Sequence, residues 1–108
     1  MVLVTFKVTV RDDVDQDAFH QTAGRMMELV AKMPGFKGIE WFGAIDDPHT
    51  QLALAEFESH EAVKAWKQNT EHLAAQKRGR EEFFARYRIQ IADIAREYGY
   101  DATTKVAV

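Results

Sequence analysis

Apolar and polar residues alternate over the first ten positions of the chain, and this period of two is typical of a β-strand. One face of the expected strand carries Val2, Val4, Phe6, Val8 and Val10. The residues between them are only half polar, since they include Leu3. The pattern therefore predicts a strand over residues 2–10 with one buried face and a second face that is partly covered.

The spacing then changes to that of a helix. Asp15 is the expected N-cap, because its carboxylate can accept hydrogen bonds from the free N–H groups of the first turn. Pro34 ends the helix and Gly35 allows the chain to turn. Between these limits the apolar side chains recur on one helical face: Phe19, Ala23, Met26, Met27, Val30 and Met33.

A hairpin is expected next. Residues 36–45 and 51–57 both read as strands, and Trp41 and Phe42 occupy neighbouring positions on the first of them. Neighbouring strand residues face opposite sides of a sheet, so one aromatic ring packs under the helices and the other faces a barrel or pocket. Residues 46–49, with Pro48, carry the signal of a tight turn.

A second helix follows the hairpin. Ser59 is its expected N-cap. Asn69 and Thr70 are expected to break it into two pieces, with Thr70 capping the second. Gly79 is expected to end or kink the helix, and residues 81–85 add one further turn.

Alternation returns at Tyr87, Ile89 and Ile91, which predicts a final strand that runs to about Tyr98. Ile94 falls off this alternation, so a bulge is expected near Ala92 and Asp93.

The order β-α-β-β-α-β predicts an α+β, ferredoxin-like fold with a four-stranded antiparallel sheet and both helices on one face. The other face is apolar enough to require cover, which favours a homodimer in which two sheets form a barrel. Residues 1–100 would form the domain. Residues 101–108 would form a C-terminal tail that packs on a neighbour or stays loose.

Composition narrows the function. The chain has 108 residues and a net charge of −3, with a pI near 5.8, which argues against a nucleic-acid partner. It has no cysteine, so thiolate catalysis and cysteine metal sites are excluded. No signal peptide and no apolar run long enough for a membrane span is visible, so a cytoplasmic protein without a membrane partner is expected.

Four segments of this sequence resemble the antibiotic biosynthesis monooxygenase superfamily, also called the dimeric α/β barrels, and in particular its bacterial single-domain members. They are MPGFKGIEWF, FESHEAVKAW, EHLAAQKRGREEFFARYRI and AREYGY. The resemblance covers residues 2 to about 100. It implies a fold and a superfamily, which includes cofactor-independent oxygenases and heme-degrading enzymes.

The residues that serve heme in the family are only partly present. Heme-degrading members have an asparagine on the first strand, a tryptophan on the second helix and, ten residues later, a histidine that binds iron. Trp66 matches the tryptophan, but Gln76 stands ten residues after it and Phe6 aligns with the asparagine. His72 would be a substitute ligand if it turned inward.

The pattern of the cofactor-independent members is also incomplete. They carry an asparagine and a tryptophan on the third strand, in a pattern like N-x-x-x-W-E-S. Here Ala53 and Phe57 occupy those positions, in the segment ALAEFES.

His72 is the expected general base, because a neutral imidazole can take a proton from a phenol or hydroquinone near pH 7. The alternative is a helix-surface histidine that bonds to Glu71 or to a partner subunit. Trp66 would stack on an aromatic substrate, or else belong to the core. Tyr87 or Arg86 would bind the developing oxyanion.

The expected substrate contacts are Trp41, Phe42, Met26, Phe57 and Gln76. The methionine stripe of the first helix would line an adaptable apolar pocket, or simply pack on the sheet. Basic residues around positions 77–88 would guide an anionic substrate, or form a solvated, self-paired surface.

The resemblance thus implies a monooxygenase that oxidises an aromatic or quinol-like substrate without a cofactor. One alternative is a heme-binding or heme-degrading enzyme with His72 as the ligand. Another is a non-catalytic dimer that binds a small hydrophobic molecule. Flavin and nicotinamide have no sequence support, since no glycine-rich phosphate loop or dinucleotide fingerprint is present.

Overall fold

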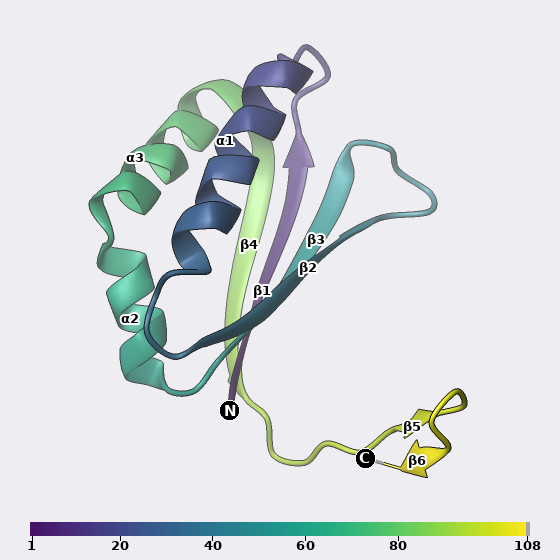
Figure 1. Ribbon diagram of the computed structural model, residues 1–108. Helices are drawn as coiled ribbons and strands as arrows, with labels where there is room; N and C mark the ends of the chain where they lie inside the picture. Colours follow the sequence, from purple (N-terminus) through teal and green to yellow (C-terminus); the bar gives the residue numbers. More distant parts are fainter. Residues whose placement is uncertain (108) are drawn as a thin grey trace.

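The computed structural model describes residues 1–107 and shows one sheet with all helices on one side (Figure 1). The predicted α+β, ferredoxin-like fold is confirmed. In chain order the elements are β1 (Val2–Val10), α1 (Gln16–Val30), β2 (Phe36–Gly43), β3 (Thr50–Phe57), α2 (His60–Gln68), α3 (Thr70–Arg78), the π-helical turn η1 (Gly79–Phe83), β4 (Phe84–Asp93), β5 (Tyr100–Asp101) and β6 (Val106–Ala107).

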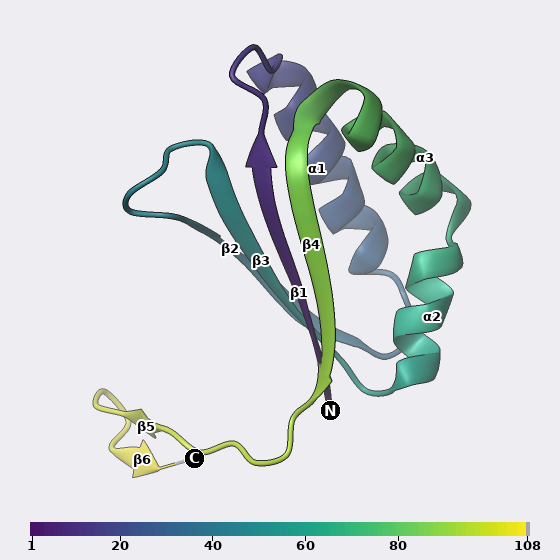
Figure 2. The ribbon, with the colours of Figure 1, turned by 180° about the vertical axis from the view of Figure 1, so that it is seen from behind.

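The four long strands form an antiparallel sheet in the order β2-β3-β1-β4. Seen from behind, the same sheet presents a face that no helix covers (Figure 2). In the register, Phe6 lies opposite Ala53 on one side and Ile89 on the other. Side chains of one parity therefore face the helices, and those of the other parity form this open face.

The core lies between the sheet and the helices and falls into two clusters. One is centred on Phe57 at the end of β3 and includes residues of α2. The other joins Val10, Phe19 and Phe83 at the opposite end of the sheet. The stretch between the two clusters is where the functional site lies.

Two of the three predicted caps are confirmed. The Asp15 carboxylate accepts from the Ala18 N–H at 3.0 Å, and the Ser59 hydroxyl accepts from the Ala62 N–H at 3.2 Å. The prediction of Thr70 as the third cap was wrong. Asn69 has the extended backbone of an N-cap and its side chain accepts from the His72 N–H at 3.1 Å, so Thr70 is the first residue of α3.

The prediction that Gly79 ends or kinks the helix is confirmed, because α3 ends at Arg78 with Gly79 as its C-cap and Gly79 opens the π-helical turn η1. This turn replaces the extra helical turn expected at residues 81–85. Gly79 is buried, and a Cβ atom at this position would run directly into the ring of Phe84. The absence of a side chain therefore lets Phe84 pack against the turn.

The last long strand is shorter than predicted. β4 ends at Asp93, which lies opposite Val2, and one further backbone hydrogen bond joins the Ile94 N–H to the Met1 oxygen at 3.0 Å. The bulge expected near Ala92 and Asp93 is absent. The register of β1 and β4 shifts instead between Thr9 and Val10.

The C-terminal segment leaves the sheet and folds into a small two-stranded hairpin. Tyr100 pairs with Ala107 and Asp101 with Val106. Both ribbon views show this hairpin lying away from the sheet and helices (Figures 1 and 2). None of the helices in residues 1–107 has the length and hydropathy needed to cross a membrane.

Candidate functional site

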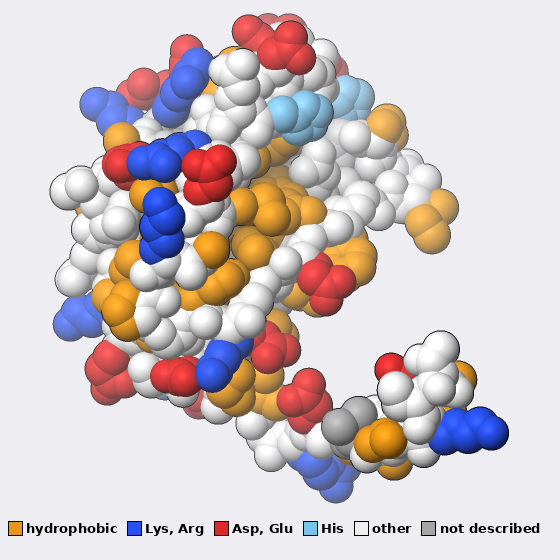
Figure 3. All heavy atoms as spheres, viewed as in Figure 1, with side chains coloured by type: hydrophobic (Ala, Val, Ile, Leu, Met, Phe, Trp, Pro, Cys, Tyr) orange, Lys and Arg blue, Asp and Glu red, His pale blue; other side chains and the backbone are white. Residues whose placement is uncertain are grey.

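A pocket of about 450 Å³ lies between the helix layer and the sheet. This volume is in the range of small-molecule sites in proteins. In the space-filling view, apolar side chains gather in the hollow between the helices and the strands (Figure 3). Its wall is built by α1, α2, α3 and η1 on one side and by all four long strands on the other.

Most of the predicted site residues meet in this pocket. The residues that line it are His72, Trp66, Tyr87, Trp41, Met26, Phe57 and Gln76. They come from six elements of the chain, and the sheet register brings the strand residues among them to one face.

Phe42 and Arg86 lie outside the pocket, on the open face of the sheet. Trp41 pairs with Ala53 and points toward the helices, so Phe42, one residue further, points the other way. Arg86 precedes Tyr87 and is displaced from the pocket for the same reason. These two residues therefore contact no molecule held between the helices and the sheet.

His72 is held by a hydrogen bond that fixes which ring nitrogen carries the proton. Its Nδ1 lies 3.0 Å from the backbone oxygen of Trp66. A carbonyl oxygen only accepts, so Nδ1 carries the hydrogen in the neutral ring. The lone pair is then on Nε2, and this is the nitrogen that can take a proton.

The ring of His72 also stacks on the indole of Trp66, with 4.1 Å between centroids and 12° between planes. Burial lowers the pKa of His72 below its ordinary value, and the hydrogen bond to the Trp66 oxygen only partly opposes this shift. The ring is therefore neutral at pH 7 and available as a base.

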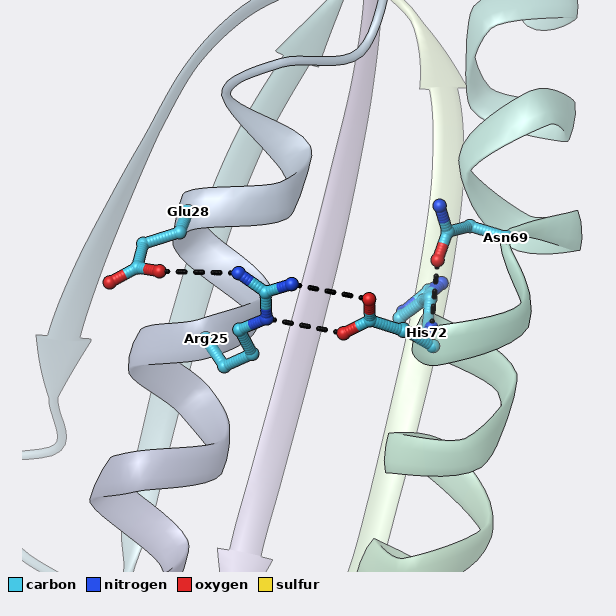
Figure 4. Close-up of polar contacts among 5 residues, drawn as sticks. Arg25, Glu28, Asn69 and His72 are labelled. Atoms are coloured by element: carbon cyan, nitrogen blue, oxygen red, sulfur yellow. Dashed lines mark hydrogen bonds and ion pairs between the residues drawn. The ribbon is translucent and has the colours of Figure 1, made fainter.

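The break between α2 and α3 creates this arrangement. Because α2 ends at Gln68, the Trp66 oxygen accepts from the Asn69 N–H at 3.1 Å and has a lone pair left for His72. Asn69 caps the next helix and so fixes the first turn, in which His72 lies (Figure 4). The sequence pair Asn69-Thr70 predicted the break, but not the bond it makes possible.

Glu71 does not bind His72. Its carboxylate accepts two hydrogen bonds from Arg25 of α1, at 3.1 and 3.2 Å, while Arg25 also reaches Glu28 at 3.5 Å (Figure 4). The expected alternative of a His72–Glu71 contact is therefore excluded. The pair instead joins α1 to α3 beside the pocket.

An aromatic wall of the pocket was not predicted. Phe6 makes edge-to-face contacts with Trp41, Phe84 and Tyr87, with ring centroids 5.6 to 6.2 Å apart. Phe6 is the one aromatic residue in the first alternating segment, which is the signal that could have marked it. Which rings lie next to Phe6 depends on the strand register, and the register could not be predicted from the sequence.

The residues present do not favour heme or a metal ion. No group of three His, Asp or Glu side chains with metal-binding geometry occurs in residues 1–107. Gln76 and Phe6 both line the pocket, and the resemblance aligns them with the iron ligand and the asparagine of heme-degrading members. The one imidazole of the lining, His72, has a ring face covered by Trp66.

Comparison with known proteins agrees with this architecture. The profile of the antibiotic biosynthesis monooxygenase family matches residues 1–78. YqjZ of Bacillus subtilis (strain 168), an uncharacterized protein, is 30% identical over 86 residues, which cover 80% of this chain and 74% of YqjZ.

Solved structures share the fold at low identity. Rv0793 of Mycobacterium tuberculosis is 14% identical with a TM-score of 0.78, and the match covers 89% of this chain and 96% of that one. SnoaB, a cofactor-independent oxygenase from Streptomyces nogalater, is 16% identical with a TM-score of 0.75, covering 89% and 94%. Since the family profile spans most of the sequence and the fold agrees with it, the chain belongs to the antibiotic biosynthesis monooxygenase family.

Proposed function

We propose that this protein is a cofactor-independent monooxygenase of small aromatic, quinol-like molecules, with His72 as the general base. The observation that carries the proposal is the bond from His72 Nδ1 to the Trp66 oxygen, which leaves Nε2 of a pocket-lining imidazole unprotonated. SnoaB, which has the same fold, is a cofactor-independent oxygenase, and this supports the absence of a cofactor here.

The proposed reaction begins with proton transfer from a substrate hydroxyl to His72 Nε2. The resulting anion is electron-rich at a conjugated ring carbon, and this carbon forms a bond to O₂. The peroxide takes up the proton and loses water, so that C–H becomes C=O. One oxygen atom enters the product and the other leaves in water, which balances a phenol and O₂ against a quinone and water.

The other pocket residues bind and orient the substrate. Phe6 and Trp41 offer an edge-to-face aromatic wall, and Met26 adds an adaptable apolar surface on the helix side. One face of Trp66 is covered by His72, so Trp66 holds the base in place as well as lining the pocket. Tyr87 is the remaining candidate for the oxyanion contact, since Arg86 faces away.

The test is oxygen consumption with a panel of hydroquinones and hydroxynaphthalenes. We expect His72→Gln to lower the rate by about 10²–10⁴-fold, which is the usual contribution of a general base. His20→Gln is the matched control, because His20 is exposed on α1 and lies outside the pocket lining. Equal rates in the parent and His72→Gln would remove His72 as the base.

A non-catalytic binding protein is the second candidate, and a specific observation favours it. Ala53 and Phe57 line the pocket at the positions where cofactor-independent relatives carry asparagine and tryptophan. If the whole panel binds without oxygen consumption above the uncatalysed rate, the binding role replaces the enzymatic one.

A further inference from the structure

The charged groups of the pocket lining are all of one sign. Lys67 is the one charged side chain in the lining that the structure describes, and no Asp or Glu belongs to it. His72 adds no charge, because burial keeps its ring neutral at pH 7. The one formal charge of the described lining is therefore positive, although the chain as a whole carries a net charge of −3.

The charge of Lys67 is not balanced by a neighbour. Lys67 is the penultimate residue of α2, next to Trp66, and within residues 1–107 it forms no ion pair. Two arginines of the same helix layer are paired. Arg25 bonds to Glu71, and Arg78 bonds to Glu82 at 2.5 Å.

A second group in the lining also lacks its counterpart. The indole Nε1 of Trp41 is buried and has no hydrogen-bond acceptor among the described residues. A buried donor without a partner costs about 1–3 kcal/mol of stability. No side chain of the described pocket lining supplies that acceptor.

The other polar side chains of the lining add no charge. The Thr22 hydroxyl donates to the Ala18 oxygen at 2.9 Å and accepts from Arg78 at 3.5 Å, so it is already engaged. Gln76 and Tyr87 each offer both a donor and an acceptor. Lys67 thus lies unpaired at a mainly apolar cavity, whose wall also contains the indole of Trp41 with its unpartnered nitrogen.

We propose that the molecule bound in this pocket is an aromatic anion, with its acidic group neutralised by Lys67 at the rim and its apolar rings inside. This inference rests on the proposed function in one respect, since it takes the same pocket as the substrate site. It restricts the class of substrates to aromatic acids. The lysine attracts the anion to the mouth of the pocket, where exposure to water keeps the cost of desolvating both charges small.

Two fluorescent probes test this directly. 8-Anilinonaphthalene-1-sulfonate and N-phenyl-1-naphthylamine share one ring system, and only the first carries a sulfonate. Each is titrated into the full chain and into Lys67→Met, which keeps an apolar stem but removes the charge. We expect Lys67→Met to lower the affinity for the anionic probe about 3- to 10-fold, as for the loss of one partly exposed ion pair. The affinity for the neutral probe should change by less than about 2-fold.

Lys64→Met is the matched control, because Lys64 lies on the same helix, is exposed and does not line the pocket. It should change neither affinity, and Lys67→Arg should restore binding of the anionic probe. Loss of both probes to the same extent in Lys67→Met, no loss of the anionic probe, or failure of either probe to bind would overturn the proposal. These readouts need no turnover, so an inactive oxygenase with the expected probe affinities would refute the proposed function alone.

Discussion

At the scale of single residues, the proposed chemistry depends on the protonation of one imidazole. His72 must be neutral to accept a proton, and burial lowers its pKa below the ordinary value. We expect kcat/KM to be constant around pH 7 and to fall in acid, with a midpoint below the usual histidine value of about 6.5. A pH–rate profile measures this midpoint, and one clearly above 6.5 would contradict the assignment.

Trp41 gives a second prediction at this scale. Trp41→Phe removes a buried donor that has no acceptor in the described structure and keeps an aromatic ring in place. Since such a donor is costly, the free energy of unfolding should be unchanged or rise by up to about 1 kcal/mol, despite the smaller ring. Urea denaturation measures it, with Trp66→Phe for comparison. A loss above about 2 kcal/mol would show that the indole nitrogen has a partner.

Most of the residues that the sequence assigned to the site line the pocket, but their mutual contacts were not predicted. Helical spacing and strand alternation were enough to bring His72, Trp66 and Trp41 toward one cavity. Phe42 and Arg86 were misplaced because a neighbour in a strand faces the opposite side, and the parity of each strand is set by pairing over long sequence distances. The hydrogen bond from His72 to the Trp66 oxygen depends on the exact residue at which the helix breaks, and the sequence pattern does not give that position to within one residue.

At the scale of elements, the π-helical turn η1 between α3 and β4 leaves no room for a side chain at Gly79. Gly79→Ala would force a methyl group into the ring of Phe84, which lines the pocket. We expect a loss of about 1–3 kcal/mol in the free energy of unfolding, which is the usual cost of overpacking.

Gly24→Ala is its counterpart in α1. A Cβ atom at Gly24 meets open space, so alanine should raise the stability by up to about 1 kcal/mol through helix propensity. Thermal denaturation of both variants compares them directly. If both alanines stabilise the protein equally, the Phe84 ring is free to move away from η1.

Elements were predictable where the pattern was local. Asp15, Ser59 and the turn before β3 all act within a few residues, and the sequence located them correctly. The first helix ends at Val30, earlier than Pro34, which was expected to end it. The end of β4 could not be predicted from nearby residues. It is set by the start of its partner β1, more than ninety positions earlier in the chain, and alternation beyond Asp93 carries no information about that partner.

At the scale of the whole molecule, the open face of the sheet calls for a partner. We propose that two copies associate through it. Its apolar side chains include Phe42, which is 47% exposed, and Leu54, while Lys7 and Glu56 add charges of both signs. A surface that carries both signs can pair with a copy of itself across a two-fold axis.

Leu54→Glu tests this association by placing a charge in the centre of the open face. Static light scattering at micromolar concentration should give the mass of a dimer for the parent and of a monomer for the variant. Ile45→Glu is the control, because Ile45 is fully exposed in the β2–β3 turn. A parent that scatters as a monomer would refute the proposed dimer.

The pocket and the open face lie on opposite sides of the same sheet. In a dimer built through the open faces, the two cavities would point outward with both sheets between them, and neither subunit would touch the ligand of the other. Each site would then work alone. Saturation should be hyperbolic with a Hill coefficient of 1, and a mixed dimer with one His72→Gln subunit should keep half of the parent's turnover.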